Sequence, residues 1–160
     1  MKLETALKRR ALLDRAKRVA MVGASANPLR PSYFVLRYLQ THGYDVAPIN
    51  PAYEEIDGTR CYPSLEAYAR ERGAPDVVDV FRKPEECPRV VREAIAAGAK
   101  AIWFQYGVIN DEAIRLADQA GLDVVVDRCM KVEHARFDGG LSLAGFDSGV
   151  LSSKRRRRAG

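Results

Sequence analysis

A group of small and polar residues that could hold an anion lies directly after the first strongly apolar stretch of the chain. Five residues make up this group: Gly23, Ala24, Ser25, Ala26 and Asn27. A glycine allows the backbone to turn tightly, and small side chains let phosphate oxygens approach main-chain N–H groups. The side chains of Ser25 and Asn27 can add hydrogen bonds. The group therefore predicts a phosphate-binding loop at a strand-to-helix junction.

Three cationic side chains are expected near this loop. Arg30 follows it closely, and Arg82 and Lys83 come after another apolar stretch. Guanidinium and ammonium groups bind phosphates through charge-assisted hydrogen bonds. Surface Arg and Lys are also common without any ligand, so the prediction depends on these cations sharing one rim with Gly23.

The strands that must position these residues can be predicted from the apolar runs. Five short runs are bounded by turn signals, and they cover residues 19–22, 44–49, 76–81, 101–104 and 124–126. Such runs suit strands that are covered on both faces. Segments with helix start and stop signals separate these runs. The alternation predicts a single α/β domain with a doubly wound, parallel, five-stranded sheet.

Cap residues and glycines mark the helices between these strands. The expected helices cover residues 4–16, 33–41, 63–72, 84–97 and 111–120. Ser32 and Asn110 are predicted N-caps, and a glycine follows the end of each of the last four helices. Beyond Val126 the periodic order fades. We therefore expect a folded domain over residues 1–136 and a flexible basic tail over residues 137–160.

Ligands of an open parallel sheet bind beyond the carboxyl ends of the strands, near the point where the strand order reverses. Polar and aromatic residues at those ends are therefore candidate binding residues. Besides the loop and the three cations, they are Asn50, Pro51, Tyr53, Phe81, Gln105 and Gly107.

Two common nucleotide-binding patterns are missing from the sequence. An NAD site usually has an acidic residue at the end of the second strand, where this chain has Asn50 and Pro51. The triphosphate-binding pattern G-x-x-x-x-G-K followed by Ser or Thr does not occur either. The sequence therefore favours neither NAD binding nor ATP hydrolysis.

The net positive charge of the chain comes from one segment near its C-terminal end. The 160 residues carry a net charge of +5, and five cations lie together at residues 154–158. Without them the remaining chain is neutral, so we interpret this run as a solvated terminal segment. Binding of nucleic acid through the run is the alternative. No run is apolar enough to span a bilayer, and the first residues do not form a signal peptide, so a cytoplasmic protein is expected.

The cysteines indicate reduced thiols. Cys61, Cys87 and Cys129 are widely spaced, which gives neither a disulfide framework nor a zinc ribbon. Cys129, Glu133 and His134 lie too close in sequence to converge easily on one ion, and a fourth ligand is lacking. No metal site is predicted.

Six motifs occur in a specific order along the chain. They are Val22-Gly23-Ala24-Ser25 with Asn27-Pro28, Gly43-Tyr44, Ile49-Asn50-Pro51, Asp76-Val77-Val78-Asp79-Val80-Phe81, Ile102-Trp103-Phe104-Gln105 with Gly107, and Asp127-Arg128-Cys129-Met130-Lys131. This order resembles the single-domain CoA-binding proteins, which are relatives of the CoA-binding domain of the succinyl-CoA synthetase α subunit. The resemblance covers roughly residues 15–135.

The resemblance implies a Rossmann-like fold with coenzyme A lying across the strand ends. By similarity, the loop from Gly23 to Asn27 would hold the phosphates of the cofactor. Two further residues, Pro51 and Tyr53, would lie beside the nucleotide. The remaining predicted neighbours of the nucleotide are Arg82, Lys83 and Gln105. The synthetase also needs a second domain with a phosphohistidine, and His42 and His134 occupy unrelated positions. Ligase activity by this chain alone is therefore not expected.

These observations favour a non-catalytic carrier, sensor or regulatory protein that binds coenzyme A or an acyl-CoA. An NAD(P)-linked oxidoreductase, or a CoA-dependent transferase that uses Cys129, is the alternative. Arg128 and Lys131 flank this cysteine, and neighbouring cations lower the pKa of a thiol. A reactive Cys129 could form a mixed disulfide with the cofactor or accept an acyl group. A small buried side chain that closes the end of the sheet is the other interpretation of Cys129.

Overall fold

Five parallel strands form the centre of the molecule, in the spatial order β2–β1–β5–β6–β7. The structure is a computed structural model, and it describes residues 1–138. The strands are β1 (Arg18–Val22), β2 (Asp45–Ile49), β5 (Val77–Val80), β6 (Ala101–Phe104) and β7 (Asp123–Val125). Successive crossovers run to opposite sides of β1, so the strand order reverses between β1 and β5. The predicted α/β architecture with a parallel five-stranded sheet is confirmed.

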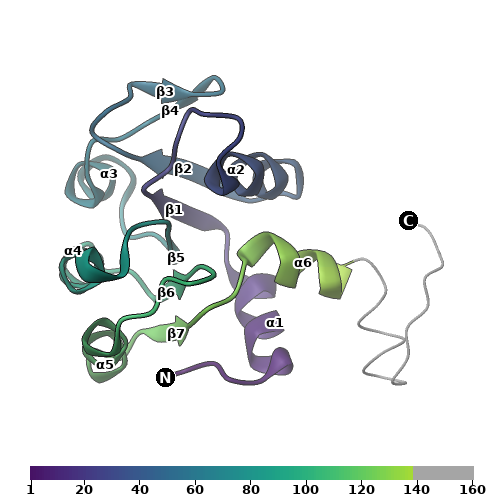
Figure 1. Cartoon of the computed structure of the whole chain (residues 1–160), viewed down its shortest axis with the longest axis vertical. Coiled ribbons are helices and arrows are strands. Elements are labelled where there is room, and N and C mark those ends of the chain that lie inside the picture. The colour runs from purple at the N-terminus through teal and green to yellow at the C-terminus, as the bar shows by residue number, and fades with distance from the viewer. Residues whose placement is uncertain (139–160) are drawn as a thin grey trace.

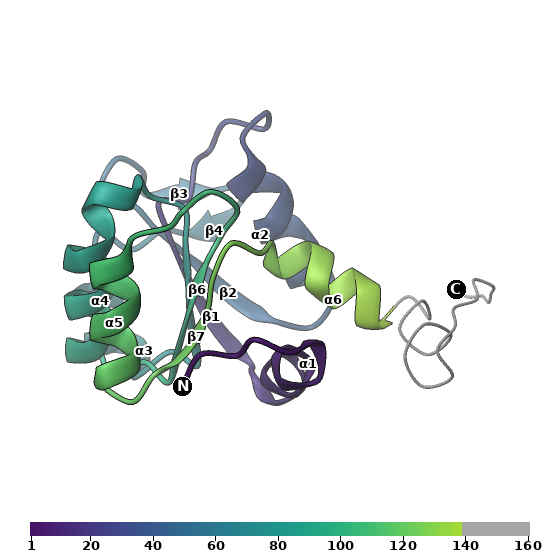
Figure 2. The same ribbon diagram turned by 60° about the horizontal axis from the view of Figure 1, so that its bottom comes forward.

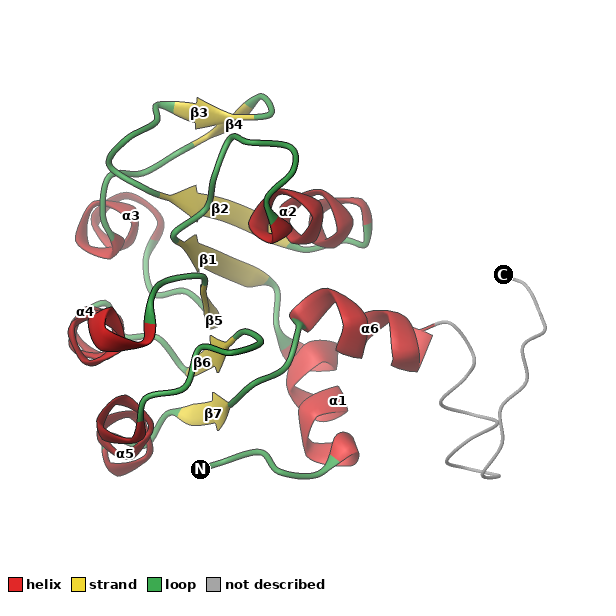
Figure 3. Ribbon diagram, in the orientation of Figure 1, coloured by secondary structure: helices red, strands yellow, loops and turns green. Residues whose placement is uncertain are grey.

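Helices cover both faces of this sheet (Figures 1 and 2). One face carries α1 (Ala6–Arg15), α2 (Pro31–Thr41) and α6 (Met130–Asp138), and the other carries α3 (Leu65–Arg72), α4 (Cys87–Ala96) and α5 (Asp111–Gln119). A 3-10 turn, η1 (Pro84–Glu86), leads into α4. A small antiparallel hairpin of β3 (Glu55–Ile56) and β4 (Thr59–Arg60) lies beyond β2 (Figure 3). The two helical layers bury the sheet from both sides.

The strands are apolar along almost their whole length because both of their faces are buried. Val19 and Met21 of β1 and Trp103 of β6 are completely buried under the layer of α1, α2 and α6. Val78 of β5 and Ile102 of β6 are equally buried under α3, α4 and α5. This arrangement explains why the strands read as continuous apolar runs and not as alternating patterns.

Short segments occupy the two edges of the sheet. Beside β7, the N–H of Leu3 donates to Val124 O at 2.8 Å, and the N–H of Val124 donates to Met1 O at 2.9 Å. Beside β2, the N–H of Tyr62 donates to Pro48 O at 3.0 Å. Each outer strand is therefore hydrogen-bonded on its outer side.

Of the two predicted N-caps, Asn110 is confirmed and Ser32 is not, and α3 begins at Leu65, two residues after the predicted start. Asn110 and Ser64 cap α5 and α3 through their side chains, which accept the N–H groups of Ala113 and Ala67. Helix α2, however, begins at Pro31, one residue before the predicted cap Ser32. A proline suits the first helical position, because its missing N–H has no acceptor there. The Ser32 hydroxyl does not cap the helix; it accepts the N–H of Ser25 instead.

Helix α6 was not expected from the sequence, which predicted that the order fades beyond Val126. The buried positions of α6 are Met130, Glu133 and Phe137, so its buried face includes a charged residue and gives a weak apolar pattern. Glu133 accepts from Arg9 Nε of α1 at 2.9 Å, and both side chains are buried. A long-range ion pair therefore helps to hold this helix. Of the predicted basic tail, residues 139–160 lie outside the described residues.

Candidate functional site

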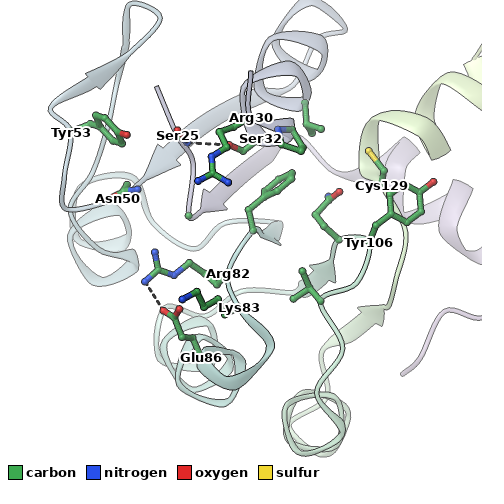
Figure 4. Close-up of a pocket in the computed structure, with 16 residues that line it drawn as sticks. Ser25, Arg30, Ser32, Asn50, Tyr53, Arg82, Lys83, Glu86, Tyr106 and Cys129 are labelled. Carbon is green, nitrogen blue, oxygen red and sulfur yellow. Dashed lines mark hydrogen bonds and ion pairs between the residues drawn. The ribbon is translucent and has the colours of Figure 1, made fainter. Parts of the chain in front are cut away.

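A cavity of about 630 Å³ opens at the carboxyl ends of the strands, beside the point where the strand order reverses (Figure 4). Its wall comes from the loops after β1, β2, β5 and β6, the start of α2 and the residue before α6. The lining residues are Gly23, Ser25, Arg30, Pro31, Ser32, Val35, Asn50, Tyr53, Phe81, Arg82, Lys83, Glu86, Gln105, Tyr106, Val108 and Cys129. A cavity of this size and place is typical of a ligand site in an open α/β sheet.

Gly23 brings the loop after β1 against the loop after β5. Its φ is +86°, in the left-handed region, and a Cβ at this position would overlap the carbonyl oxygen of Phe81. The same Cβ would lie 2.7 Å from Cδ of Arg82. Only a glycine can turn the chain here and let the two loops meet.

The remainder of the predicted phosphate loop is fixed by its own hydrogen bonds. The N–H of Ser25 donates to Ser32 Oγ at 3.0 Å, and the N–H of Asn27 donates to Ser25 Oγ at 3.1 Å. Of the five loop residues, Gly23 and Ser25 line the cavity, whereas Ala24, Ala26 and Asn27 lie outside its lining. Ser32 joins the wall as a residue that we predicted only as a helix cap.

Asn50 at the end of β2 joins two loops. Its Nδ2 donates to Ala24 O at 2.8 Å, and its Oδ1 accepts the N–H of Ala52 at 2.9 Å. Both ends of the amide are therefore bound to backbone, although the residue still lines the cavity. Tyr53 is half-buried and lines the cavity too, whereas the exposed Pro51 lies outside the lining.

The three predicted cations all lie at the cavity, together with one carboxylate. Arg30 is at the N-cap of α2, and Arg82 and Lys83 follow β5. An Nη of Arg82 binds Glu86 Oε1 at 2.6 Å, as the dashed line in Figure 4 shows. Glu86 was not among the predicted site residues, although its i,i+4 spacing from Arg82 suits such an ion pair. Cationic charge prevails on this side of the cavity.

A buried carboxyl group lies behind Gln105, which lines the cavity. Asp79 of β5 is completely buried, and Gln105 donates from Nε2 to Asp79 Oδ1. Burial raises the pKa of the Asp79 carboxyl to about 7, although the hydrogen bond from Gln105 acts in the opposite direction. A single carboxylate within an apolar run was the signal that could have singled out Asp79.

Gly107 lies outside the cavity lining and helps to fix the conformation of the loop after β6. Its φ is +74°, and its N–H donates to Asp127 Oδ1 at 2.8 Å. Its neighbours Tyr106 and Val108 line the cavity instead. Tyr106 is one of the more exposed aromatic side chains, so the loop presents a ring to the site.

Cys129 lines the cavity at the start of α6. Burial raises the pKa of its thiol, which favours the interpretation as a small buried side chain over the reactive thiol with a lowered pKa. The N–H groups of Lys131 and Val132 and the Lys131 charge act toward a lower pKa, but they do not prevail. Arg128 is directed elsewhere, since its Nη1 lies 3.5 Å from Glu133 Oε1. The thiol is therefore largely neutral near pH 7.

Neither a metal-binding cluster nor a membrane span is found in the part of the chain that the structure describes. Within residues 1–138, no group of three or more His, Cys, Asp or Glu side chains is arranged to hold a metal ion. No helix in the same part of the chain is long and apolar enough to cross a membrane.

A comparison with known families identifies the chain. A family described as a CoA binding domain matches residues 17–135, which include every residue of the cavity lining. This protein belongs to the CoA-binding domain family. The predicted resemblance to CoA-binding proteins is thereby confirmed, together with the Rossmann-like α/β fold that it implied.

Several small proteins are similar to this CoA-binding domain over nearly their whole length. The uncharacterized protein YneT of Bacillus subtilis strain 168 is 38% identical over 124 residues, which are 78% of this chain and 90% of YneT. The structure of a hypothetical protein from Pyrococcus horikoshii OT3 is 47% identical, with a TM-score of 0.79. That match covers 84% of this chain and 93% of the other.

Larger ligases contain a similar domain. The ADP-forming acetate–CoA ligase I of Archaeoglobus fulgidus is 28% identical over 121 residues, which are 71% of this chain but 18% of the ligase. The apo structure of the dinucleotide-forming acetyl-coenzyme A synthetase 1 of Ca. Korarchaeum cryptofilum is 27% identical, with a TM-score of 0.56. The match covers 68% of this chain and 25% of the synthetase. The CoA-binding domain thus corresponds to one part of these enzymes.

Proposed function

We propose that this protein binds coenzyme A, or an acyl derivative of it, in the cavity at the strand ends, and acts as a non-catalytic carrier, sensor or regulatory protein. One observation supports this proposal above the others. The Gly23 turn, the start of α2 and three cations converge on a single cavity, in a chain of the CoA-binding domain family.

Electrostatics favours a ligand with several phosphate groups. Arg30, Arg82 and Lys83 supply three positive charges, and the start of α2 adds the positive end of a helix dipole. Coenzyme A carries a diphosphate and a ribose 3′-phosphate, so it can use all of these groups. A ligand with fewer phosphates would leave part of this charge uncompensated.

The shape of the wall suggests how the ligand is oriented. Figure 4 shows Tyr53 and Asn50 on one side of the cations, with Tyr106 and Cys129 on the other. We assign the adenine to the Tyr53 side, where an aromatic ring can stack on it. The uncharged arm of the cofactor then extends past Tyr106 toward Cys129, and its sulfur reaches that end.

A binding role accounts for the site more simply than the catalytic alternatives do. A transferase that uses Cys129 needs a thiolate, and burial raises the pKa of this thiol. An NAD(P)-linked enzyme would need a group at the end of β2 for the ribose hydroxyls, yet both ends of the Asn50 amide bind backbone. The matching ligases are several times longer than the matched region.

The proposal is tested by thermal unfolding in the presence of ligands. Saturating coenzyme A should raise Tm by several degrees, because a ligand at about 100 times its Kd stabilises the fold by roughly 2.7 kcal/mol. Dephospho-CoA, which lacks the 3′-phosphate, should raise Tm less, and NAD should not raise it. Equal shifts for coenzyme A and dephospho-CoA would contradict the role of the cations.

Two variants and a matched control locate the site. Arg82→Gln and Lys83→Gln should each weaken the binding of coenzyme A, measured by calorimetry. Arg92→Gln removes an exposed cation of α4 that lies outside the cavity lining, and it should leave the affinity unchanged. An equal loss in all three variants would indicate a general effect of charge and not a bound phosphate.

A further inference from the structure

Asp79 is a carboxyl group with incomplete hydrogen bonding in the interior of the sheet. It is completely buried in β5, between Met21 of β1 and Trp103 of β6 in the strand register. Its Oδ1 accepts from Gln105, but its Oδ2 has no hydrogen-bond partner among the described residues. Burying such a group is unfavourable, so a role in the site would explain its presence.

Gln105 connects this carboxyl group to the cavity. The side chain is almost fully buried, lines the cavity and donates from Nε2 to Asp79. Its Oε1 accepts no hydrogen bond from residues 1–138, so the amide can still accept from a molecule in the cavity. The protonation state of Asp79 therefore affects whether Gln105 presents a hydrogen-bond donor or an acceptor to a ligand.

The protonation of Asp79 can change which way the Gln105 amide faces. An ionised carboxylate can only accept, so it holds Nε2 toward itself and leaves Oε1 for the ligand. A protonated carboxyl can donate to Oε1, which turns the amide over and presents Nε2–H to the ligand. The same side chain can thus offer either an acceptor or a donor.

We propose that Asp79 and Gln105 together distinguish the thiol of coenzyme A from the thioester of an acyl-CoA, and that this preference is coupled to a proton. This inference rests on the proposed function and deepens it. With Asp79 ionised, Gln105 Oε1 accepts the S–H of free coenzyme A. With Asp79 protonated, Gln105 Nε2 donates to the thioester carbonyl, which can only accept. Asp79 is a positioning residue that acts through Gln105.

The position of the pair fits the sulfur end of the ligand. The neighbour Tyr106 and Cys129 lie on the side of the cavity away from Tyr53 and Asn50 (Figure 4). Because the cations hold the phosphates, the uncharged arm of the cofactor must occupy this side. A neutral thiol or thioester suits a wall that contains Val108 and no charged side chain beyond the Asp79 carboxyl behind it.

Both states of Asp79 are accessible near neutral pH, because burial raises the pKa of its carboxyl to about 7. Its neighbours in the strand register, Met21 and Trp103, do not titrate. The thiol of Cys129, at the start of α6, does interact with Asp79, but its own pKa is raised, so it stays neutral in this range. The charged residues nearest in the chain are Asp76, directly before β5, and Arg82 and Lys83 after it, and Lys131 acts on Cys129 from α6. Hydrogen bonds from the backbone N–H groups of Lys17 and Arg18 lower the pKa of Asp76, although burial acts in the opposite direction.

The test compares the affinities of coenzyme A and acetyl-CoA at about pH 6 and about pH 8, one unit on each side of the pKa. The ratio of Kd for coenzyme A to Kd for acetyl-CoA should rise roughly three- to tenfold at the lower pH, the worth of one hydrogen bond. The phosphates of the two ligands are identical, so their titration cancels in the ratio. A ratio that does not change with pH would overturn the inference and leave the proposed function intact.

Three variants keep the result interpretable. Asp79→Asn and Gln105→Met should each abolish the pH dependence of the ratio, whereas Glu93→Gln, on the surface of α4, should retain it. Circular dichroism establishes that each variant is folded, and either of the first two suffices if the other is not. Retention of the wild-type pH dependence in a folded Asp79→Asn or Gln105→Met would overturn the inference. If the wild-type protein binds neither ligand at either pH, the proposed function fails, and this inference fails with it.

Discussion

The α-carbon of Gly23 faces the carbonyl oxygen of Phe81 with no space for a side chain between them. The two residues directly follow neighbouring strands, and the N–H of Phe81 also donates to Val22 O at 2.8 Å. This close approach brings the loop after β1 and the cations after β5 onto one rim. The cavity exists in its present shape because the two loops meet here.

Replacement of Gly23 by alanine should therefore destabilise the fold. The left-handed φ alone costs about 1 kcal/mol for a residue with a Cβ, and the overlap with Phe81 adds to that cost. The matched control is Gly107→Ala, because Gly107 also has a left-handed φ but has nothing within 4 Å of its added Cβ. Urea unfolding should give a clearly larger loss for Gly23→Ala. Similar losses would show that the close approach is unimportant.

Removal of the carboxylate of Glu86 should strengthen the binding of coenzyme A. Glu86 holds Arg82 in an ion pair and places a negative charge where phosphates are expected. Glu86→Gln should lower Kd roughly two- to fivefold, in line with a partly exposed pair, and the gain should shrink as salt rises. Glu93→Gln removes a carboxylate that pairs with Arg89 outside the cavity lining, and it should leave Kd unchanged. Weaker binding by Glu86→Gln would mean that Glu86 positions Arg82 for the ligand.

The stability of the protein should depend on pH through Asp79. Burial raises the pKa of this carboxyl in the folded state to about 7, above its value of about 4 in the unfolded chain. The folded state therefore binds the proton more tightly, so this contribution to stability is fully present below about pH 4 and is lost as pH rises toward 7. Each unit of pKa difference corresponds to about 1.4 kcal/mol.

Asp79→Asn removes this dependence. Unfolding free energies of the wild type and the variant, measured between about pH 4 and about pH 8, should diverge in slope, with the wild type losing more stability as pH rises. The comparison of slopes isolates Asp79 from the other groups that titrate in the same range. Parallel slopes would show that the carboxyl titrates normally.

The ion pair between Arg9 and Glu133 should be essential for holding α6. Both side chains are buried, and Arg128 and Arg136 also approach Glu133, at 3.5 Å and 3.6 Å. Glu133→Gln leaves a buried guanidinium without its counter-charge, which should cost about 3–5 kcal/mol in chemical unfolding. The control Glu66→Gln removes an exposed partner of Arg70 and should cost less than about 1 kcal/mol. An equally small effect at Glu133 would mean that other contacts hold the helix.

The features that the sequence revealed are those that depend on near neighbours in the chain. The five strands, the cap Asn110 and the glycine turn at Gly23 all leave a local signature. Asp79 and Glu133 do not, because each gains its role from a partner that is 26 or 124 residues away. For Cys129 the sequence left a reactive thiol and a buried side chain open. Its flanking cations are adjacent in the sequence, but the fold buries the thiol and pairs Arg128 with Glu133.

The predicted site residues divide in a similar way. Those that follow a strand directly, such as Gly23, Asn50 and Gln105, lie in the cavity wall because the strand ends share one edge of the sheet. Pro51 and Gly107 lie a step further along their loops, and loop conformation carries them outside the lining. The side of each loop that faces a cavity depends on turns that the sequence pattern does not specify.

The hydrogen-bonded segments beside β7 and β2 also limit how copies of this protein can meet. An open edge strand offers a row of N–H and C=O groups that can recruit a further strand, which is a common route to aggregation. Here Leu3 and Tyr62 already take such groups on the two outer strands. These segments oppose growth of the sheet by strand addition, so among residues 1–138 the helical layers, the hairpin and the rim of the cavity are the surfaces left for contacts with other molecules.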